Sequence, residues 1–102
     1  MYIFTWDDDK NYLNIRKHGI SFYKAQEAFF DKQRVITLDT RHTTNTETRY
    51  FCFGKINEMI ATVRFTIRDN QIRIFGAGYW REGRKRYEEE NKTQTERIQD
   101  VC

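Results

Sequence analysis

The spacing of apolar residues changes near Arg34, so helices are expected before that point and strands after it. A short apolar run, Tyr2–Trp6, leads into Asp7-Asp8-Asp9, which supply an N-cap and the acidic first turn that a helix dipole favours. We expect a helix from these acids to about His18, where Gly19 suits the left-handed conformation that ends a helix.

A second helix is expected after Ser21, whose hydroxyl suits the N-cap position, and it should stop near Asp31. Its apolar residues recur every three to four positions, which indicates one buried face. These residues are Phe22, Ala25 and either Ala28 or Phe29.

After Arg34 the apolar residues alternate with a period of two, which is typical of half-buried strands. Asn57-Glu58 and Asp69-Asn70 are short polar breaks that suit tight hairpins. The last three strands should therefore form an antiparallel meander. The expected strands are Val35–Asp39, Arg49–Lys55, Met59–Ile67 and Gln71–Ala77.

Alternation along the third of these strands separates a core face from a solvent face. Arg64 falls on the solvent face. The core face comprises Met59, Ala61, Val63, Phe65 and Ile67, and the solvent face comprises Thr62, Arg64, Thr66 and Arg68.

The predicted fold class is α+β, with N-terminal helices packed on a mainly antiparallel sheet and a C-terminal helix at about Arg81–Asn91. A chain of 102 residues is large enough for one core. We expect a single domain at residues 1–91 and a polar C-terminal tail at 92–102, either a frayed extension of the helix or disordered.

Two cysteines do not form a disulfide framework, and Cys52 between two phenylalanines is expected to fill the core. Neither a leader nor a run of about 18 apolar residues is visible, which favours a cytoplasmic protein with no membrane segment. The histidines and cysteines lie at no recurrent ligand spacing, so neither a metal site nor a cofactor is expected.

The net charge of +3 permits nucleic acid binding without requiring it, but the cations are concentrated between Arg64 and Tyr87. Cations that meet phosphates, interleaved with aromatic rings that stack on unpaired bases, favour single-stranded nucleic acid, and RNA above all. The alternative is a solvated, charge-rich helix after a core strand. The cations are Arg64, Arg68, Arg73, Arg81, Arg84, Lys85 and Arg86, against only Asp69 and Glu82.

Metal-free RNA cleavage requires groups that orient the 2′-hydroxyl, neutralise the phosphorane and protonate the leaving oxygen. Guanidinium groups suit the charge-stabilising role because they match phosphate oxygens bidentately. We expect arginines from separate elements to converge on one concave face, with Arg84 and Arg86 steering the RNA. The converging residues are Arg49, Arg64, Arg73 and Arg81.

Proton transfer has several candidates, each with a structural alternative. His18 could instead interact with the helix dipole, His42 could be a solvated loop residue, and Tyr87 could pack against the sheet. Trp80 is most simply a core or interface anchor. The candidates are His18, His42, Lys17, Tyr79 and Tyr87.

The chain resembles the BrnT-type toxins of bacterial toxin–antitoxin pairs over roughly residues 2 to 90. The family opens with the pattern W-D-x-x-K-x-x-x-N-x-x-K-H-G-x-x-F-x-x-A, followed by F and D. The matching residues of this chain are Trp6-Asp7, Lys10, Asn14, Lys17-His18-Gly19, Phe22, Ala25, Phe29 or Phe30 and Asp31. Its D-x-x-H loop and E-x-R strand start are matched by Asp39, His42, Glu47 and Arg49. Its R-I strand and terminal R-x-x-Y-E element are matched by Arg73, Arg84, Arg86, Tyr87 and Glu88.

This resemblance implies a RelE-like fold, an endoribonuclease that arrests translation, and a BrnA-type ribbon-helix-helix antitoxin, with operator DNA bound only through the antitoxin complex. The sequence departs from the commoner pattern at Gly76–Trp80, where many relatives carry further basic residues, and Arg81 is expected to replace an arginine missing there. A binding module without catalysis, holding RNA or the antitoxin, is the alternative function.

These arguments give a set of expected site residues. The catalytic residues are expected to be His18, Arg49, Arg64, Arg81 and Tyr87. The RNA-binding residues are expected to be Lys17, Arg73, Tyr79, Arg84, Lys85 and Arg86.

Overall fold

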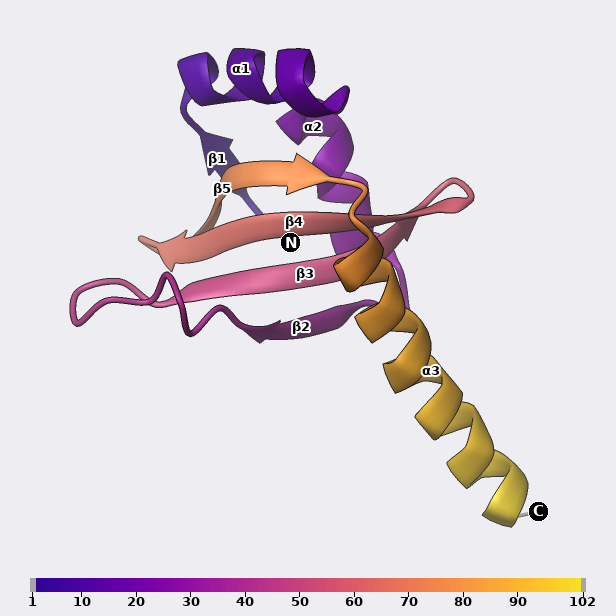
Figure 1. The fold of residues 1–102 in the computed structure, drawn as a ribbon. Coiled ribbons are helices and arrows are strands. Elements are labelled where there is room, and N and C mark those ends of the chain that lie inside the picture. Colours follow the sequence, from indigo (N-terminus) through magenta and orange to yellow (C-terminus); the bar gives the residue numbers. More distant parts are fainter. Residues whose placement is uncertain (1, 102) are drawn as a thin grey trace.

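The computed structural model describes residues 2–101, with side chains for residues 2–92. It contains a sheet and helices in the α+β arrangement that the sequence predicts (Figure 1). The elements are β1 (Phe4–Trp6), α1 (Asp8–His18), α2 (Phe22–Ala25), a 3₁₀ helix η1 (Gln26–Phe30), β2 (Val35–Leu38), β3 (Arg49–Ile56), β4 (Met59–Arg68), β5 (Gln71–Gly78) and α3 (Arg81–Val101).

The sheet has five strands in the order β1-β5-β4-β3-β2. The meander of β3, β4 and β5 is confirmed, and its tight turns place Asn57, Asp69 and Asn70 at positive φ. The Tyr2–Trp6 run supplies an additional strand, β1, which pairs with β5 in parallel. This pairing joins the N-terminus to a strand near the other end of the chain.

Both predicted helix starts are confirmed by their caps. The Asp7 carboxylate accepts a hydrogen bond from the Lys10 amide at 3.1 Å, and the Ser21 hydroxyl accepts one from the Lys24 amide at 3.0 Å. Gly19 ends α1 at φ 71°, in the left-handed conformation.

The second helical segment is not one continuous α-helix as expected, because α2 tightens into η1 after one turn. A 3₁₀ turn is common at the end of an α-helix, where packing decides the winding. Here the tighter turn buries Ala28 and Phe29 together against the sheet.

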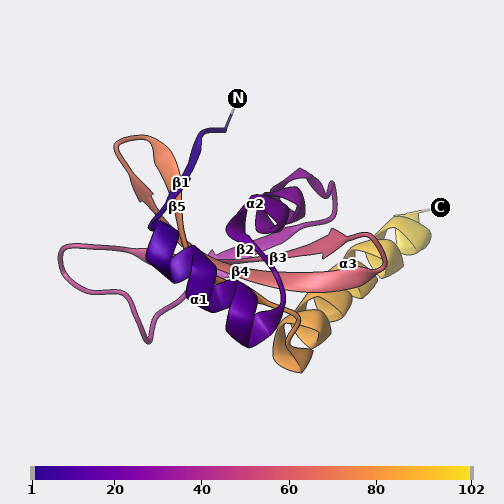
Figure 2. The same cartoon turned by 90° about the horizontal axis from the view of Figure 1, so that it is seen from above.

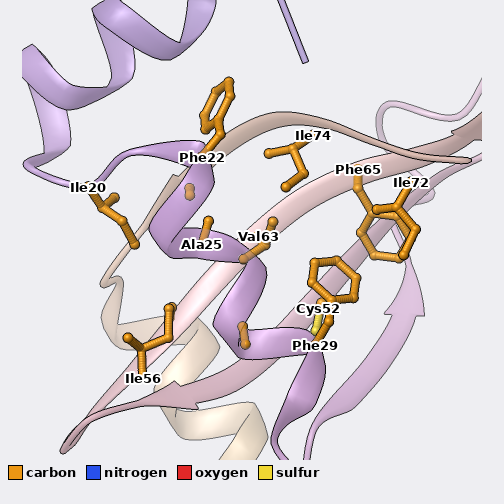
Figure 3. Packing of buried hydrophobic residues seen from close by; sticks show 13 residues of the cluster. Ile20, Phe22, Ala25, Phe29, Cys52, Ile56, Val63, Phe65, Ile72 and Ile74 are labelled. Carbon is orange, nitrogen blue, oxygen red and sulfur yellow. The ribbon is translucent and has the colours of Figure 1, made fainter. Parts of the chain in front are cut away.

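The core lies between α2 with η1 and one face of the sheet, and Figure 3 shows these side chains pointing toward one another. Ala25 from α2 lies beside Val63 of β4, and both side chains are fully buried. Cys52 is also fully buried, which confirms its predicted core role, and burial raises its thiol pKa to about 12.

The core face predicted for β4 is confirmed at the centre of the strand, but the predicted solvent exposure is wrong for Thr62 and Thr66, which are 4% and 2% exposed. Gly83 of α3 packs on Thr62, and the Thr66 hydroxyl donates to the Thr48 carbonyl at 2.6 Å. Ala61, Val63 and Phe65 are buried in the core, but Met59 and Ile67, at the two ends of the predicted strand, are 54% and 51% exposed.

The opposite face of the sheet is covered only at one end, where α3 begins (Figure 2). Gly83 permits this approach, because a Cβ there would overlap the Thr62 hydroxyl and the Phe53 ring. Helix α1 borders the β5 side of the sheet. The Asn14 side chain fixes it there by donating to the Ala77 carbonyl at 2.9 Å and accepting from the Ala77 amide at 3.2 Å.

Helix α3 extends past the predicted end at Asn91. The division into a domain at 1–91 and a polar tail at 92–102 stays a prediction. Cys102 and the side chains of the tail beyond Lys92 lie outside the described residues.

We predict that Gly54→Ala destabilises the fold by about 1–3 kcal/mol, because the added Cβ would overlap the Ala28 backbone and force η1 away from β3. Gly76→Ala is the matched control on the neighbouring part of the sheet, since its Cβ would meet the nearest atom at an ordinary 3.7 Å. Urea unfolding of both variants checks this, and equal loss of stability in the two would contradict it.

Candidate functional site

The candidate site is the sheet face opposite α2 and η1, called here the open face. Because directly paired residues of neighbouring strands point to the same face, the register aligns side chains in rows across β3, β4 and β5. These rows are Arg49, Thr66 and Arg73; Phe51, Arg64 and Gly76; and Phe53, Thr62 and Gly78. Three of the four arginines expected to converge, Arg49, Arg64 and Arg73, therefore share this face.

Arg49 reaches across β4 to the other side of the open face. Its guanidinium carbon lies 4.0 Å from the centroid of the Phe75 ring, in a cation–π arrangement. Phe75 is placed there by an irregularity in the β4–β5 register. The Lys10 ammonium lies 5.7 Å from the same ring, so a cation from α1 joins this cluster.

Arg64 lies in the middle row between Phe51 and Gly76. Gly76 has no side chain to compete for this space, and a Cβ there would lie 3.7 Å from Cδ of Arg64. The solvent-face position predicted for Arg64 is confirmed in that its side chain is half-buried on the face away from the core. A half-buried guanidinium keeps donors available to a phosphate.

Helix α3 contributes Arg86 to the open face. Its guanidinium carbon lies 5.3 Å from the centroid of the Phe53 ring, and Nη2 donates to the Thr37 hydroxyl at 3.4 Å. The Phe51 and Phe53 rings are nearly parallel, with centroids 5.6 Å apart. Phe53 is only 3% exposed beneath α3, whereas Phe51 and Phe75 are half-buried, so these two rings and the neighbouring cations form the accessible combination that suits unpaired bases and phosphates.

The Gly76–Trp80 segment builds a corner of this face. A Cβ on Gly78 would collide with the Trp80 indole, so the glycine makes room for that ring. Trp80 also meets His18 at the end of α1, edge to face, with ring centroids 5.1 Å apart. The predicted catalytic candidate His18 thus lies exposed at the corner, next to Lys17, which is also exposed.

The remaining predicted cations lie elsewhere. Helix α3 and the β3–β4 hairpin enclose an open groove of about 1080 Å³, called here the α3 groove. Arg81 is among its lining residues rather than in the sheet rows, so Arg81 does not join Arg49 and Arg64 there. The groove is also lined by Tyr79, Trp80, Arg84, Lys85 and Lys55, together with the acidic Glu58, Glu88 and Glu89.

Tyr87 occupies the packing position that was the alternative to its catalytic role. The residue is 6% exposed, and its hydroxyl donates to the Asp31 carboxylate at 2.6 Å. Burial, followed by this hydrogen bond, raises the pKa of Tyr87 above its ordinary value. A phenol that is buried and engaged in this way is poorly placed to exchange a proton with a substrate.

The Asp31 carboxylate accepts hydrogen bonds from three separate parts of the chain. Besides the Tyr87 hydroxyl, it accepts from the Lys55 amide at 2.7 Å and the Gln33 amide at 2.9 Å. Burial alone would raise its pKa, but the hydrogen bonds from Tyr87, Lys55 and Gln33 outweigh that effect and lower it.

His42 has a defined position in the β2–β3 loop. Its Nδ1 lies 2.8 Å from Oδ2 of Asp39, which is 3% exposed, whereas the His42 side chain is 49% exposed. The sequence identified both residues, but their i,i+3 spacing did not reveal that the carboxylate is buried.

Sequence reasoning missed the aromatic residues of the open face, Phe51, Phe53 and Phe75. The signal for the first two was present, because they share the parity of Arg49 along β3. Phe75 carried no such signal, because the register irregularity next to it is visible only in the structure.

Within residues 2–92, no three His, Cys, Asp or Glu side chains gather in a way that could hold a metal ion. None of the helices in that part of the chain is long and apolar enough to cross a membrane.

The fold and the open face define a small α+β protein whose cationic, aromatic sheet surface suits single-stranded nucleic acid. A sequence profile of the family described as "Ribonuclease toxin, BrnT, of type II toxin-antitoxin system" matches residues 6–83. This match spans most of the chain, so the protein belongs to the BrnT family of ribonuclease toxins, and a type II toxin has a cognate antitoxin as its partner. No curated protein matches the chain.

We predict that Tyr87→Phe lowers the free energy of unfolding by about 1.5–3 kcal/mol at pH 7, because it removes a hydrogen bond to a charged group. The difference in unfolding free energy between Tyr87→Phe and the unchanged chain should shrink as pH falls below 3.8. The pKa of Asp31 is lower in the folded state than in the unfolded state, so its hydrogen bonds contribute stability above the unfolded value and lose it when the carboxylate is protonated. Urea unfolding at several pH values checks this.

The control for this substitution is Tyr12→Phe, which removes a hydroxyl from a residue that is 60% exposed. A difference between the two variants that does not depend on pH would argue against the Asp31 hydrogen bond as its origin.

Proposed function

We propose that this chain is an endoribonuclease that needs no metal ion and that cleaves RNA on the open face. The observation that carries the proposal is the convergence of Arg49, Arg64 and Arg86 among phenylalanine rings on one sheet face of a BrnT-family chain. The arginines would supply the positive charge that the reaction requires.

In the proposed reaction the RNA 2′-hydroxyl attacks the adjacent phosphorus. Arg64, in the middle of the face, and Arg49, whose guanidinium extends over the Phe75 ring, would hold the non-bridging oxygens as their charge increases. Phe51 and Phe75 offer rings on which the flanking bases can stack. The half-buried position of these side chains strengthens charge stabilisation relative to a fully solvated surface.

The other predicted RNA-binding residues would act outside the cleavage position. Arg73 and Arg86 extend the cationic surface of the open face, and Lys17 borders its corner. The α3 groove, with Tyr79, Arg84 and Lys85, would guide the strand beyond the cleaved bond. His18, beside Trp80, stays a candidate for proton transfer at the corner, and Arg81 stays a candidate for a phosphate contact in the groove.

Cleavage of cellular RNA by this chain would arrest translation in the cytoplasm. We further propose that its antitoxin is a BrnA-type ribbon-helix-helix protein, which neutralises the toxin by covering the open face. Because no helix within residues 2–92 presents a clear base-reading pattern, operator DNA would be bound mainly through the antitoxin.

The chain is expected to cut single-stranded RNA in the presence of EDTA, and Arg49→Ala and Arg64→Ala should each slow cleavage about 10²–10³-fold. Arg64→Lys should recover only part of this loss, because an ammonium cannot match phosphate oxygens bidentately. Arg16→Ala, which removes an exposed arginine from α1, is the matched control and should cleave normally. Gel analysis of a labelled RNA measures each rate.

Three outcomes separate the alternatives. Folded protein that binds RNA without cutting it would favour the binding-module function. Cleavage that requires an added divalent ion would refute metal independence. Cleavage at the normal rate by both alanine variants, with native circular dichroism, would show that the reaction occurs away from the open face.

A further inference from the structure

We propose that His42 is the general base of the cleavage reaction and that Asp39 is its positioning residue. This inference rests on the proposed ribonuclease function, because it assigns the group that removes the proton from the RNA 2′-hydroxyl. It depends on where the β2–β3 loop places the two residues relative to the arginines of the open face.

Asp39 lies on the open face although it follows the last residue of β2. Its amide donates to the Arg49 carbonyl at 2.8 Å, which continues the register in which Leu38 pairs with Tyr50. Directly opposed residues of antiparallel strands point to the same face, with Cβ atoms about 5 Å apart. Asp39 is therefore the neighbour of Arg49 at the end of its row.

Hydrogen bonds join the β2–β3 loop to the start of β3 and so hold His42 close to the row that contains Asp39 and Arg49. Thr43 donates its hydroxyl to the Asp39 carbonyl at 2.8 Å and accepts from the Arg49 amide at 2.9 Å. The His42 amide also donates to Oδ1 of Asp39 at 3.3 Å. Backbone and side chain of His42 are thus both held by the same carboxylate.

The hydrogen bond between the His42 imidazole and the Asp39 carboxylate determines which imidazole nitrogen carries no proton. A carboxylate can only accept, so Nδ1 of His42 must carry the proton that lies between it and Asp39 at 2.8 Å. Nε2 then carries a lone pair, and the side chain is 49% exposed, so this nitrogen is accessible to a substrate. Asp39, at 3% exposure, stabilises the imidazolium that forms when Nε2 takes a proton.

The proposed reaction requires no reagent other than water. Nε2 of His42 takes the proton of the 2′-hydroxyl as its oxygen bonds to phosphorus, and the bond from phosphorus to the 5′-oxygen breaks. The departing oxygen takes a proton from solvent, and His42 returns its proton to solvent. The products are a 2′,3′-cyclic phosphate and a 5′-hydroxyl end.

The start of β3 brings further charged side chains to this end of the open face. The Arg49 backbone adjoins Asp39 while its guanidinium extends across the face to the Phe75 ring, so bound RNA would run from that guanidinium toward His42. Glu47 lies 3.7 Å from Nε of Arg49 and 3.4 Å from Arg68, which keeps this carboxylate engaged with cations. The other histidine, His18, packs its ring on Trp80 at the opposite corner of the face. Of the two, only His42 is oriented by a buried carboxylate.

The test compares RNA cleavage by the whole chain with cleavage by His42→Asn, His42→Ala and Asp39→Asn. An asparagine amide at position 42 can still donate to Asp39 and so preserve the loop, but it cannot accept a proton. We expect His42→Asn to lose at least about 100-fold in cleavage rate with unchanged RNA affinity, and Asp39→Asn to lose at least about tenfold. Added imidazole should restore part of the activity of His42→Ala but not that of Arg49→Ala.

Asn45→Ala, in the same loop and exposed, is the matched control and should cleave at the normal rate. If the unchanged chain cuts RNA and His42→Asn cuts it within a few fold as fast, His42 is not the base, and the ribonuclease function stands. Loss of activity in His42→Ala without imidazole rescue, together with weakened RNA binding in His42→Asn, would also overturn the proposal in favour of a structural loop. Absence of cleavage by the unchanged chain would overturn both proposals.

Discussion

The Asp31 carboxylate connects the parts of this molecule that its function requires. It receives the Tyr87 hydroxyl from α3, the Lys55 amide from β3 and the Gln33 amide from the turn after η1. The layer behind the sheet, the sheet itself and the helix in front of it are thereby held by one charged group. Because α3 is fixed at Tyr87, its preceding residue Arg86 is directed onto the Phe53 ring of the open face.

One face of the sheet must be covered by the core helices and the other must stay accessible. A glycine at a close helix contact serves each face. On the core face, Gly54 lets η1 approach β3 closely, which completes a dry core from one short helical segment. On the open face, Gly83 lets the start of α3 pack on Thr62 and Phe53, and the helix then extends away from the sheet (Figure 1). A sheet closed on both faces would leave no surface for a polymer substrate.

The sequence predicts the fold well because its signals are local. Asp7, Gly19 and Ser21 mark helix ends through hydrogen bonds and backbone conformations that depend on neighbours within four residues. The alternation of β3 and β4 likewise follows from the period of a single strand. In contrast, the parallel pairing of β1 with β5 joins distant segments, and no local pattern specifies it.

The site is harder to predict because it also depends on contacts between distant segments. Parity along a strand correctly puts Arg49 and Arg64 on one face, but it could not show that Arg81 turns into the α3 groove, since that depends on where α3 starts. A tyrosine three residues after Arg84 was compatible with both packing and substrate contact, and its burial against Asp31 depends on a contact between distant parts of the chain. Burial of a polar side chain is a property of the whole fold.

The Gly76–Trp80 segment shapes a corner of the open face without any cationic side chain. Without basic side chains on this strand end, Gly76 leaves space beside Arg64, and Gly78 receives the Trp80 ring that also contacts His18. The Trp80 ring forms this corner, while the cations of the face come from β3, β4 and α3. Since stacking on an aromatic ring depends little on base identity, a corner built from an indole rather than from cations suits contact with an unpaired base more than attraction of a phosphate.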